Sequence, residues 1–341
     1  MLSSGLETAN GNVMHPGVLA GKDLADSIYI VHEMKSMGLT GVTIEVSFPL
    51  LLPSFPDSVE YTTFYREIAQ VVHHEGMTLT VEENPLFESI STIPVASYYA
   101  GLTLESYAAA DHQMAQTIIN VMHPTYLSVL TEPDTYTALL HQPGIDLNVA
   151  ANGVEFVNTV MGGLVSDGTM VGAGTGTWMD PSYDQTLLKR TRIDFLDMHV
   201  YPTAPTELAN MQSEVAAAKA EHRPMIMSEC WLYPLSTADS PSFGVPAAPD
   251  LQALVTYSFW EPLDEQFLTT VVRYTRANGF LVVSPNPVLN LFAYQTYTPA
   301  LAAESPQQVL ASFGQVVTAA LTAHQLSATG LTYQQLAAHR S

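Results

Sequence analysis

The sequence contains one cysteine, few basic residues and no long apolar run. Cys230 is the only cysteine among 341 residues, so no intrachain disulfide can form. The cysteine content therefore does not determine whether the protein works in an oxidising or a reducing compartment. Lys and Arg together number 11 against 33 Asp and Glu, which gives a formal net charge of −22 at pH 7. This charge repels phosphate backbones and anionic lipid surfaces, so nucleic acids and membranes are disfavoured as partners.

No apolar stretch is long enough to span a bilayer, and the opening MLSSGLETANGN lacks the basic and apolar regions of a secretory signal. Two locations agree with this: a cytoplasmic protein, or a secreted protein whose signal has been removed. The composition, with 47% hydrophobic and 13% charged residues, is that of a chain with a large core. Because α/β barrels commonly use about 250 residues or more as one unit, we expect a single catalytic domain over residues 1–341.

Short apolar segments of β type alternate with amphipathic segments along the chain. This alternation is typical of a parallel sheet covered by helices. The expected strands are 41–48, 77–83, 126–132, 169–174, 193–200, 224–230 and 280–284. An eighth strand, first in chain order, can come from the weakly patterned GNVMH at 11–15. The pattern predicts an α/β fold, a (β/α)8 TIM barrel whose first strand is irregular or trimmed.

Helical periodicity fills the intervals between these strands and continues after the last one. Residues 288–303 and 306–325 are expected to form C-terminal helices that pack on the barrel from about residue 288. The segment 234–262 is rich in Ser, Pro and Ala, and it follows an expected strand at the position of an active-site loop. We interpret it as a rim loop.

The carboxyl ends of the expected strands are unusually polar. In a barrel of this type the catalytic residues lie at these ends and converge on one mouth. The residues concerned are Glu45, Glu82, Glu83, Asn84, Glu132, Asp197, His199, Tyr201 and Glu229. Glycoside hydrolysis needs one protonated carboxyl group and one ionised carboxylate, and Glu132 and Glu229 on different strands supply such a pair.

Three segments resemble the clan A glycoside hydrolases: YLSVLTEPDT (126–135), DMHVYP (197–202) and MIMSECWLYP (225–234). The resemblance implies a retaining double displacement, with Glu132 as the general acid/base and Glu229 as the nucleophile. It further implies that His199 contacts the substrate and that Tyr201 donates a hydrogen bond to Glu229. Such a bond favours the ionised form of the nucleophile.

The chain departs from the pattern of that clan at two places. Thr131 stands where Asn is usual, so the contact to the sugar 2-hydroxyl falls to Thr131 itself or to Asn84. The last strand, FLVVSPNP, lacks the usual Trp, and Trp231 or Trp260 can fill that space from a loop. Trp178 and Tyr233 are also candidates for stacking on pyranose rings, although packing in the core explains each of these aromatic residues equally well.

Other interpretations remain open. Glu132 can be an exposed loop carboxylate and His199 a core histidine. Glu82, Glu132, Asp197, His199 and Glu229 also form an oxygen-rich set that suits a divalent-metal sugar isomerase or lyase, although none of the four Lys residues falls at a strand end to act as a base. A third interpretation is a non-catalytic carbohydrate-binding barrel.

We expect a β-linked poly- or oligosaccharide as substrate, because the resemblance is to glycosidases. Double displacement needs no cofactor and no metal. Secretion is favoured over a cytoplasmic location because polymer-degrading enzymes are often exported. The sequence leaves the oligomeric state open.

Overall fold

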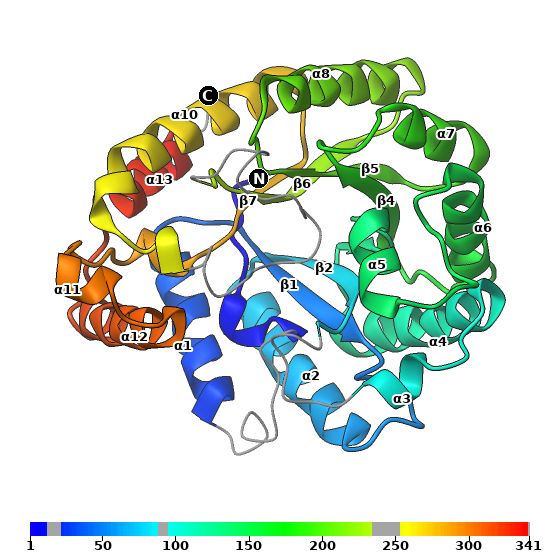
Figure 1. Cartoon of the computed structure of the whole chain (residues 1–341), viewed down its shortest axis with the longest axis horizontal. Helices are drawn as coiled ribbons and strands as arrows, with labels where there is room; N and C mark the ends of the chain where they lie inside the picture. The colour runs from blue at the N-terminus through cyan, green and yellow to red at the C-terminus, as the bar shows by residue number, and fades with distance from the viewer. Residues whose placement is uncertain (12–21, 88–94, 234–252, 340–341) are drawn as a thin grey trace.

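The computed structural model of the chain describes residues 1–11, 22–87, 95–233 and 253–339. Seven parallel strands follow one another around a sheet in chain order, and helices cover its outer face (Figure 1). The strands are β1 Gly41–Phe48, β2 Thr78–Pro85, β3 Tyr126–Ser128, β4 Met170–Gly176, β5 Phe195–Val200, β6 Met225–Cys230 and β7 Val282–Pro285. The predicted α/β barrel class is confirmed as a nearly closed barrel of parallel strands.

Helices connect these strands, and further helices follow the last strand. They are α1 Lys22–Ser36, α2 Ser58–His74, α3 Ala96–Tyr99, α4 Leu104–Met122, α5 Pro133–Leu140, α6 Ala150–Met161, α7 Ser182–Arg190, α8 Pro205–Ala220, α10 Glu261–Asn278, α11 Pro299–Ala302, α12 Pro306–Thr322 and α13 Ala328–Ala338. Short 3-10 helices are η1 Glu7–Ala9, η4 Ser258–Trp260 and η5 Leu289–Leu291. Each of the seven expected strand segments overlaps one strand of the sheet, and β2, β4 and β7 extend one or two residues past the expected ends.

The strand expected at 126–132 is shorter than predicted. It leaves the regular ladder after Ser128, and Pro133 occupies the first turn of α5. Proline suits that position because the first helical N–H groups have no partner within the helix. Glu132 is thereby placed at the N-terminal cap of a helix and not inside a strand.

Residues 1–6, which we call the closing segment, connect the two edges of the sheet. The amide of Ser3 donates to the carbonyl of Val283 on β7 at 2.9 Å, and the amide of Thr43 on β1 donates to the carbonyl of Ser4 at 3.0 Å. The closing segment therefore takes the place of the expected first strand. That strand was expected at 11–15, of which residues 12–15 lie outside the described residues.

The C-terminal region differs from its prediction. Residues 288–303 contain only the short helices η5 and α11, whereas α12 matches the expected helix at 306–325. Helix α13 was not predicted. It packs on α10 and η5, and the hydroxyl of Tyr333 donates to the carbonyl of Ser3 at 2.7 Å. The last helix thus supports the closing segment directly.

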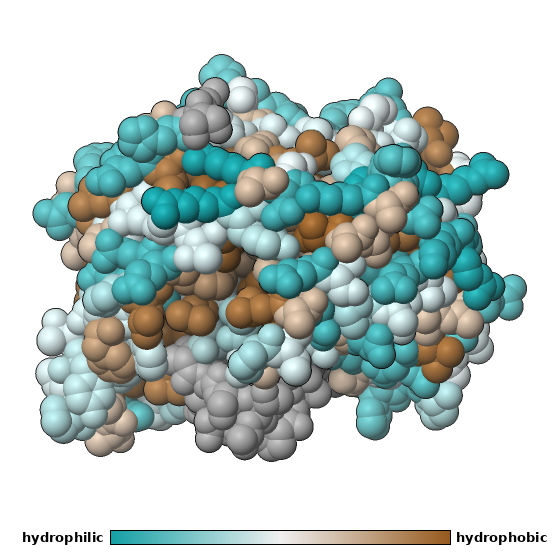
Figure 2. Space-filling view, turned by 90° about the horizontal axis from the view of Figure 1, so that it is seen from above, coloured by the Kyte–Doolittle hydropathy of each residue, from teal (hydrophilic) through white to brown (hydrophobic). Residues whose placement is uncertain are grey.

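The surface is mainly hydrophilic when the molecule is seen from above the view of Figure 1, with hydrophobic residues scattered among the polar ones (Figure 2). Beneath it lies a core that runs from the closing segment to α13 and includes Leu2, Ile44, Leu127 and Tyr333. Among the described residues, every helix is too short or too polar to cross a membrane.

Candidate active site

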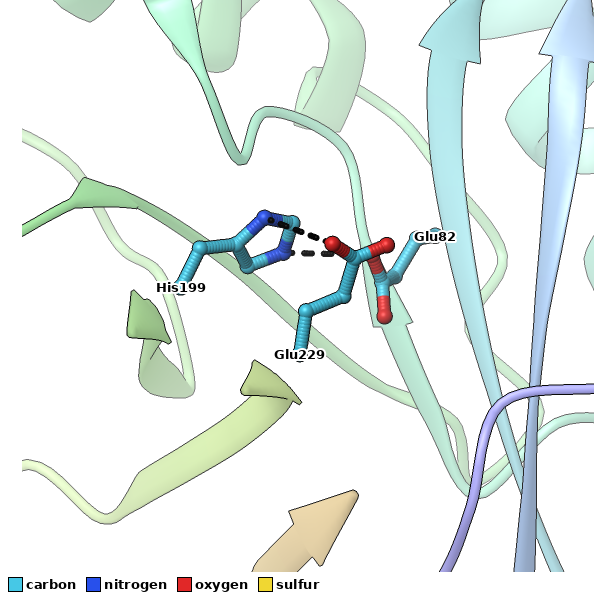
Figure 3. A group of neighbouring side chains, drawn as sticks. All are labelled: Glu82, His199 and Glu229. Atoms are coloured by element: carbon cyan, nitrogen blue, oxygen red, sulfur yellow. Dashed lines mark ion pairs between the residues drawn. The ribbon is translucent and has the colours of Figure 1, made fainter. Parts of the chain in front are cut away.

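His199 lies at the centre of a group of carboxylates at the carboxyl ends of the strands. Its side chain on β5 is 3% exposed. Nδ1 lies 2.8 Å from Oε1 of Glu132 and 3.5 Å from Oε2 of Glu229, and Nε2 lies 3.2 Å from Oε2 of Glu82. Figure 3 shows Glu82, His199 and Glu229 pointing toward one another.

The carboxyl groups of Glu132 and Glu229 face the same nitrogen atom. Since both are close to Nδ1 of His199, their nearest oxygens are separated by roughly 6 Å or less, and retaining glycosidases use a separation of about 5 Å. The side chain of Glu132 is 18% exposed and that of Glu229 is 12% exposed, so both are open to a small ligand. Thr135 holds Glu132 by donating to its Oε2 at 2.6 Å.

Glu229 also has partners on its own side of the site. The hydroxyl of Tyr201 donates to Oε2 of Glu229 at 2.5 Å, and Nδ2 of Asn286 lies 3.5 Å from Oε1. Tyr201 is buried and stacks on Tyr233, with 4.6 Å between the ring centroids and 5° between the planes. The stack fixes the direction of the hydroxyl. Hydrogen bonds of this kind favour the ionised carboxylate.

A small cavity adjoins Glu229 between the closing segment, β1 and β6. It is lined by Gly5, Leu6, Glu7, Asn10, Thr43, Glu45, Ser228, Glu229 and Asn286. Asn84 donates from Nδ2 to Oε2 of Glu45 at 2.7 Å, and Asn10 donates to the other oxygen of Glu45. The closing segment therefore supplies residues to the site as well as closing the sheet.

Burial and mutual repulsion alter the protonation of the acidic groups. Burial and the charge of Glu229 raise the pKa of Glu82 to about 8. Burial, together with the charges of Glu229 and Glu82, raises the pKa of Glu45 well above its usual range. Both shifts favour the protonated form of the group and so reduce the negative charge around Glu229.

His199 responds to the same groups in the opposite sense. Burial alone lowers the pKa of a histidine, but the charges of Glu229 and Glu82 and the hydrogen bonds to Glu132 and Glu82 outweigh it. The pKa of His199 is raised well above its ordinary value. An imidazolium donates hydrogen bonds from both ring nitrogens, which agrees with carboxylate oxygens near each of them.

Trp178 lies on the Glu132 side of the site. Its Nε1 donates to Oδ2 of Asp134 at 2.8 Å, and its ring centroid is 6.3 Å from that of Tyr201. A Cβ added at Gly176 would lie 2.2 Å from the indole ring, so the ring packs directly against the backbone of β4. Burial and the charge of Glu132 raise the pKa of Asp134 to about 6.

Two residues expected to contact the sugar 2-hydroxyl have protein partners instead. Thr131 is 3% exposed and hydrogen bonds with the hydroxyl of Tyr136 on α5. Asn84 accepts from Oγ of Ser47 at 2.6 Å and donates to Glu45, so its amide already serves the acidic group. The structure brings Asn84 to the site, whereas Thr131 faces α5.

Two of the expected tryptophans pack against other residues of the protein. Trp231 is fully buried in the main core and presents no exposed face to a ligand, because its side chain turns inward after β6. Trp260 on η4 packs in a separate small cluster with residues Ala253, Tyr257, Val309, Leu301 and Leu310. Most of the rim loop that was expected to carry such contacts, residues 234–252, lies outside the described residues.

Three further residues matter to the site geometry, and two of them, Asn10 and Asn286, were not singled out from the sequence. Asn286 follows β7, Asn10 follows the closing segment, and Ser228 connects His199 to Asp197 through its hydroxyl at 3.2 Å and 2.6 Å. Asn286 stands in the FLVVSPNP segment directly after an expected strand. Its position at a strand end is the signal that could have identified it.

Among the described residues, one group of side chains is compact enough to bind a metal ion. Glu82, His199 and Glu229 each offer one ligand atom, and these atoms lie within 4.8 Å of one another. A histidine ligand must present a lone pair to the metal. The ring nitrogens of His199 instead lie at hydrogen-bond distance from Glu132 and from Ser228 and Glu82. The donor set therefore fits a hydrogen-bonded imidazolium better than a metal ligand.

Comparison with solved structures gives the same architecture. An exo-beta-1,4-mannosidase from an Opitutaceae bacterium, strain TAV5, superposes with a TM-score of 0.61 at 12% identity, over 99% of this chain and 59% of that one. A fungal beta-1,4-galactanase gives a TM-score of 0.52 at 13% identity, over 92% of this chain and 99% of that one. The chain has the barrel fold of these glycosidases.

A rice beta-glucosidase in a covalent complex with Glc gives a TM-score of 0.50 at 11% identity, over 77% of this chain and 78% of that one. The predicted similarity to clan A glycoside hydrolases is thus confirmed at the level of the fold. The chain spans 59% of the length of the mannosidase. No family model and no curated protein matches the sequence itself.

Proposed function

We propose that the protein is a retaining β-glycosidase, with Glu132 as the general acid/base and Glu229 as the nucleophile. The observation that carries the proposal is the approach of these two carboxyl groups to one nitrogen of His199, at 2.8 and 3.5 Å. Glu132 lies at the N-terminal cap of α5 and Glu229 on β6, and both side chains are partly exposed. The separation suits a covalent glycosyl intermediate better than the wider gap of inverting enzymes.

The two carboxyl groups have surroundings that suit different tasks. Glu229 accepts a hydrogen bond from Tyr201 and approaches Asn286, which favours the anion needed to attack the anomeric carbon. Glu132 is the more exposed of the two and stands at the beginning of α5, where it can reach a leaving oxygen and later a water molecule. Separate environments for the two carboxyls are the basis of their separate roles.

The reaction proceeds in two displacements. Glu229 forms a bond to the anomeric carbon while Glu132 gives its proton to the departing oxygen, and the glycosidic bond breaks. Glu132 then takes a proton from water, whose oxygen displaces Glu229 and restores both groups. His199 donates hydrogen bonds within the site and limits the repulsion between Glu132, Glu229 and the neighbouring acidic residues.

The expected substrate is a β-linked oligo- or polysaccharide. The similar structures include proteins described as a beta-1,4-mannosidase, beta-1,4-galactanases and a beta-glucosidase, so β-1,4-mannosides, galactosides and glucosides are the first to test. Retention predicts that the first product carries the β anomer. Proton NMR of the early products on each substrate tests linkage and stereochemistry together.

Replacement of the acid/base group gives the decisive experiment. Glu132→Gln keeps the size and the hydrogen-bonding capacity of the side chain but removes its proton transfer, and kcat is expected to fall about 10²- to 10⁴-fold. The matched control is Glu155→Gln on the exposed face of α6. Unchanged turnover in Glu132→Gln would refute the assignment, and a first product with the α anomer would refute retention.

A divalent-metal sugar isomerase or lyase is the second candidate, because Glu82, His199 and Glu229 lie within the reach of one ion. That activity would be lost in EDTA and restored by magnesium or manganese. The glycosidase proposal expects turnover on β-glycosides to be unchanged by EDTA. A third possibility, a binding barrel without catalysis, expects oligosaccharide binding with no turnover in the unsubstituted chain.

A further inference from the structure

Four aromatic residues form a cluster away from the carboxylates, which we call the rim aromatic cluster: Tyr257, Phe259, Trp260 and Tyr297. The rings of Tyr257 and Phe259 are stacked, with centroids 5.6 Å apart and planes 15° apart. Tyr297 meets both of them edge-on, at 5.4 and 5.7 Å. Phe259 also contacts Trp260 at 5.0 Å. The contacts hold the rings in a fixed arrangement.

The cluster is buried on one side and open on the other. Tyr257 is 4% exposed, and it packs with Ala253 and Val309 in a small core of its own. Phe259 and Tyr297 are both 49% exposed. Phe259 and Tyr297, which lie in contact with each other, therefore present aromatic area to solvent.

The topology places this surface at the same end of the barrel as the proposed active site. Residues 257–260 belong to the connection that leaves the carboxyl end of β6, the strand of Glu229, and they immediately precede α10. Tyr297 follows β7, and the two connections are joined by the hydrogen bond from the amide of Ser258 to the carbonyl of Gln295 at 2.9 Å. In barrels of this class the connections after the strands lie on the catalytic face.

We propose that the rim aromatic cluster is a remote subsite that binds a pyranose unit of a β-linked oligosaccharide chain. This inference rests on the proposed function and deepens it. Pyranose rings present C–H groups that pack on an aromatic face, and hydroxyl groups at their edges that a tyrosine hydroxyl can meet. The cluster offers both, on the side of the barrel that carries the nucleophile. The preferred substrate is accordingly a chain of several sugars and not a single glycoside.

The test compares long and short substrates with variants of the two exposed rings. Phe259→Ala and Tyr297→Ala are each expected to lower kcat/KM on cellohexaose, β-1,4-mannohexaose or β-1,4-galactan, whichever the unsubstituted protein cleaves. The expected loss is about 3- to 10-fold, as for one lost aromatic contact. Activity on the matching 4-nitrophenyl β-glycoside should stay unchanged. Leu331→Ala is the control, because Leu331 is a similarly exposed apolar residue, at 48%, on α13.

A binding measurement separates failure of the subsite from failure of the proposed function. In the Glu132→Gln background, calorimetry with the same three carbohydrates should show weaker binding after Phe259→Ala. Equal binding or equal hydrolysis with and without Phe259 would overturn the subsite. So would a change in molar mass by light scattering, because it would show the cluster to be a contact between two copies. If the unsubstituted chain cleaves no glycoside, the proposed function fails and the calorimetry alone decides the subsite.

Discussion

At the scale of single residues, the geometry of the site depends on short contacts made by side chains whose own positions are fixed. Tyr201 shows how this works. Its ring is stacked on Tyr233 at 4.6 Å, and its hydroxyl reaches Oε2 of Glu229. The ring packing limits the hydroxyl to one direction, so Tyr201 helps to orient the proposed nucleophile together with His199.

Removal of this hydroxyl should impair catalysis and leave the fold intact. A hydrogen bond to a charged group contributes about 1.5–3 kcal/mol, so Tyr201→Phe is expected to lower kcat by about 10- to 100-fold. Steady-state kinetics on the best 4-nitrophenyl β-glycoside measures this. Tyr29→Phe is the matched control, since the hydroxyl of Tyr29 donates to the carbonyl of Leu321 at the surface. Equal kcat values for the two variants would contradict the role given to Tyr201.

At the scale of elements, the approach of β4 to β5 depends on glycine. A Cβ added at Gly174 would lie 1.8 Å from the carbonyl oxygen of Asp197, and one added at Gly172 would lie 2.2 Å from the ring of Phe195. Both neighbours belong to β5, which also carries His199. The glycines of β4 therefore allow β5, the strand of His199, to lie close to β4.

Gly174→Ala should consequently destabilise the protein, because the added methyl meets backbone atoms that cannot move aside. We expect a loss of about 1–3 kcal/mol, typical of overpacking. Gly314→Ala on α12 provides the opposite control: no atom lies within 4 Å of the added Cβ, and alanine favours a helix by about 0.5–1 kcal/mol. Urea unfolding of both variants should shift the midpoints in opposite directions, and a shared direction would contradict this account.

Much of the element order could be predicted because the strands are marked by local patterns. GVTIEVSF alternates apolar residues with Thr, Glu and Ser, as a β-strand does, and it forms β1 over the full predicted range, 41–48. The closing segment could not be found in this way. MLSSGL has little β character, and its pairing depends on residues more than 200 positions away, such as Val283. Helix α13 was missed for a similar reason, since its position depends on contacts with α10 and η5.

The site shows the same division between local and distant information. Strand ends directed attention to Glu132, His199 and Glu229, which the structure brings together. The sequence around the tryptophans gave no comparable signal of whether each ring faces the site or the core. Whether Trp231 turns into the core or toward the mouth depends on packing from several elements, and Trp260 is placed by its contacts with α11 and α12. Residue type alone does not contain that information.

At the scale of the whole molecule, the fold buries carboxyl groups for which the chain supplies few cations. Asp184 on α7 and Glu214 on α8 are both fully buried. Both oxygens of Glu214 lack a hydrogen-bond partner, whereas Oδ2 of Asp184 accepts a hydrogen bond from the hydroxyl of Thr175 at 2.8 Å. Burial, with the charge of the neighbouring carboxylate, raises the pKa of Glu214 to about 9 and that of Asp184 to about 7.

These raised pKa values predict that the protein is most stable in acid. The unfolded chain releases these protons near pH 4, whereas the folded chain retains them until about pH 7 for Asp184 and about pH 9 for Glu214. The free energy of unfolding therefore falls as the pH rises from about 4 to these values. Calorimetric melting between pH 4.5 and 9 should show a steady decrease of Tm. Glu214→Gln should flatten the profile, and the exposed Glu221→Gln should not. A Tm that rises from pH 5 to pH 8 would contradict the prediction.

The closing segment also sets the order in which the barrel can be completed. Its amides and carbonyls pair with β7, and the amino group of Met1 donates to the carbonyl of Leu281, 280 positions along the chain. During synthesis these first residues leave the ribosome long before their partner strand exists. Contacts between such distant positions form late, because a long loop must close first. We expect the barrel of the nascent chain to stay open, with β1 paired only to β2, until β7 has been made.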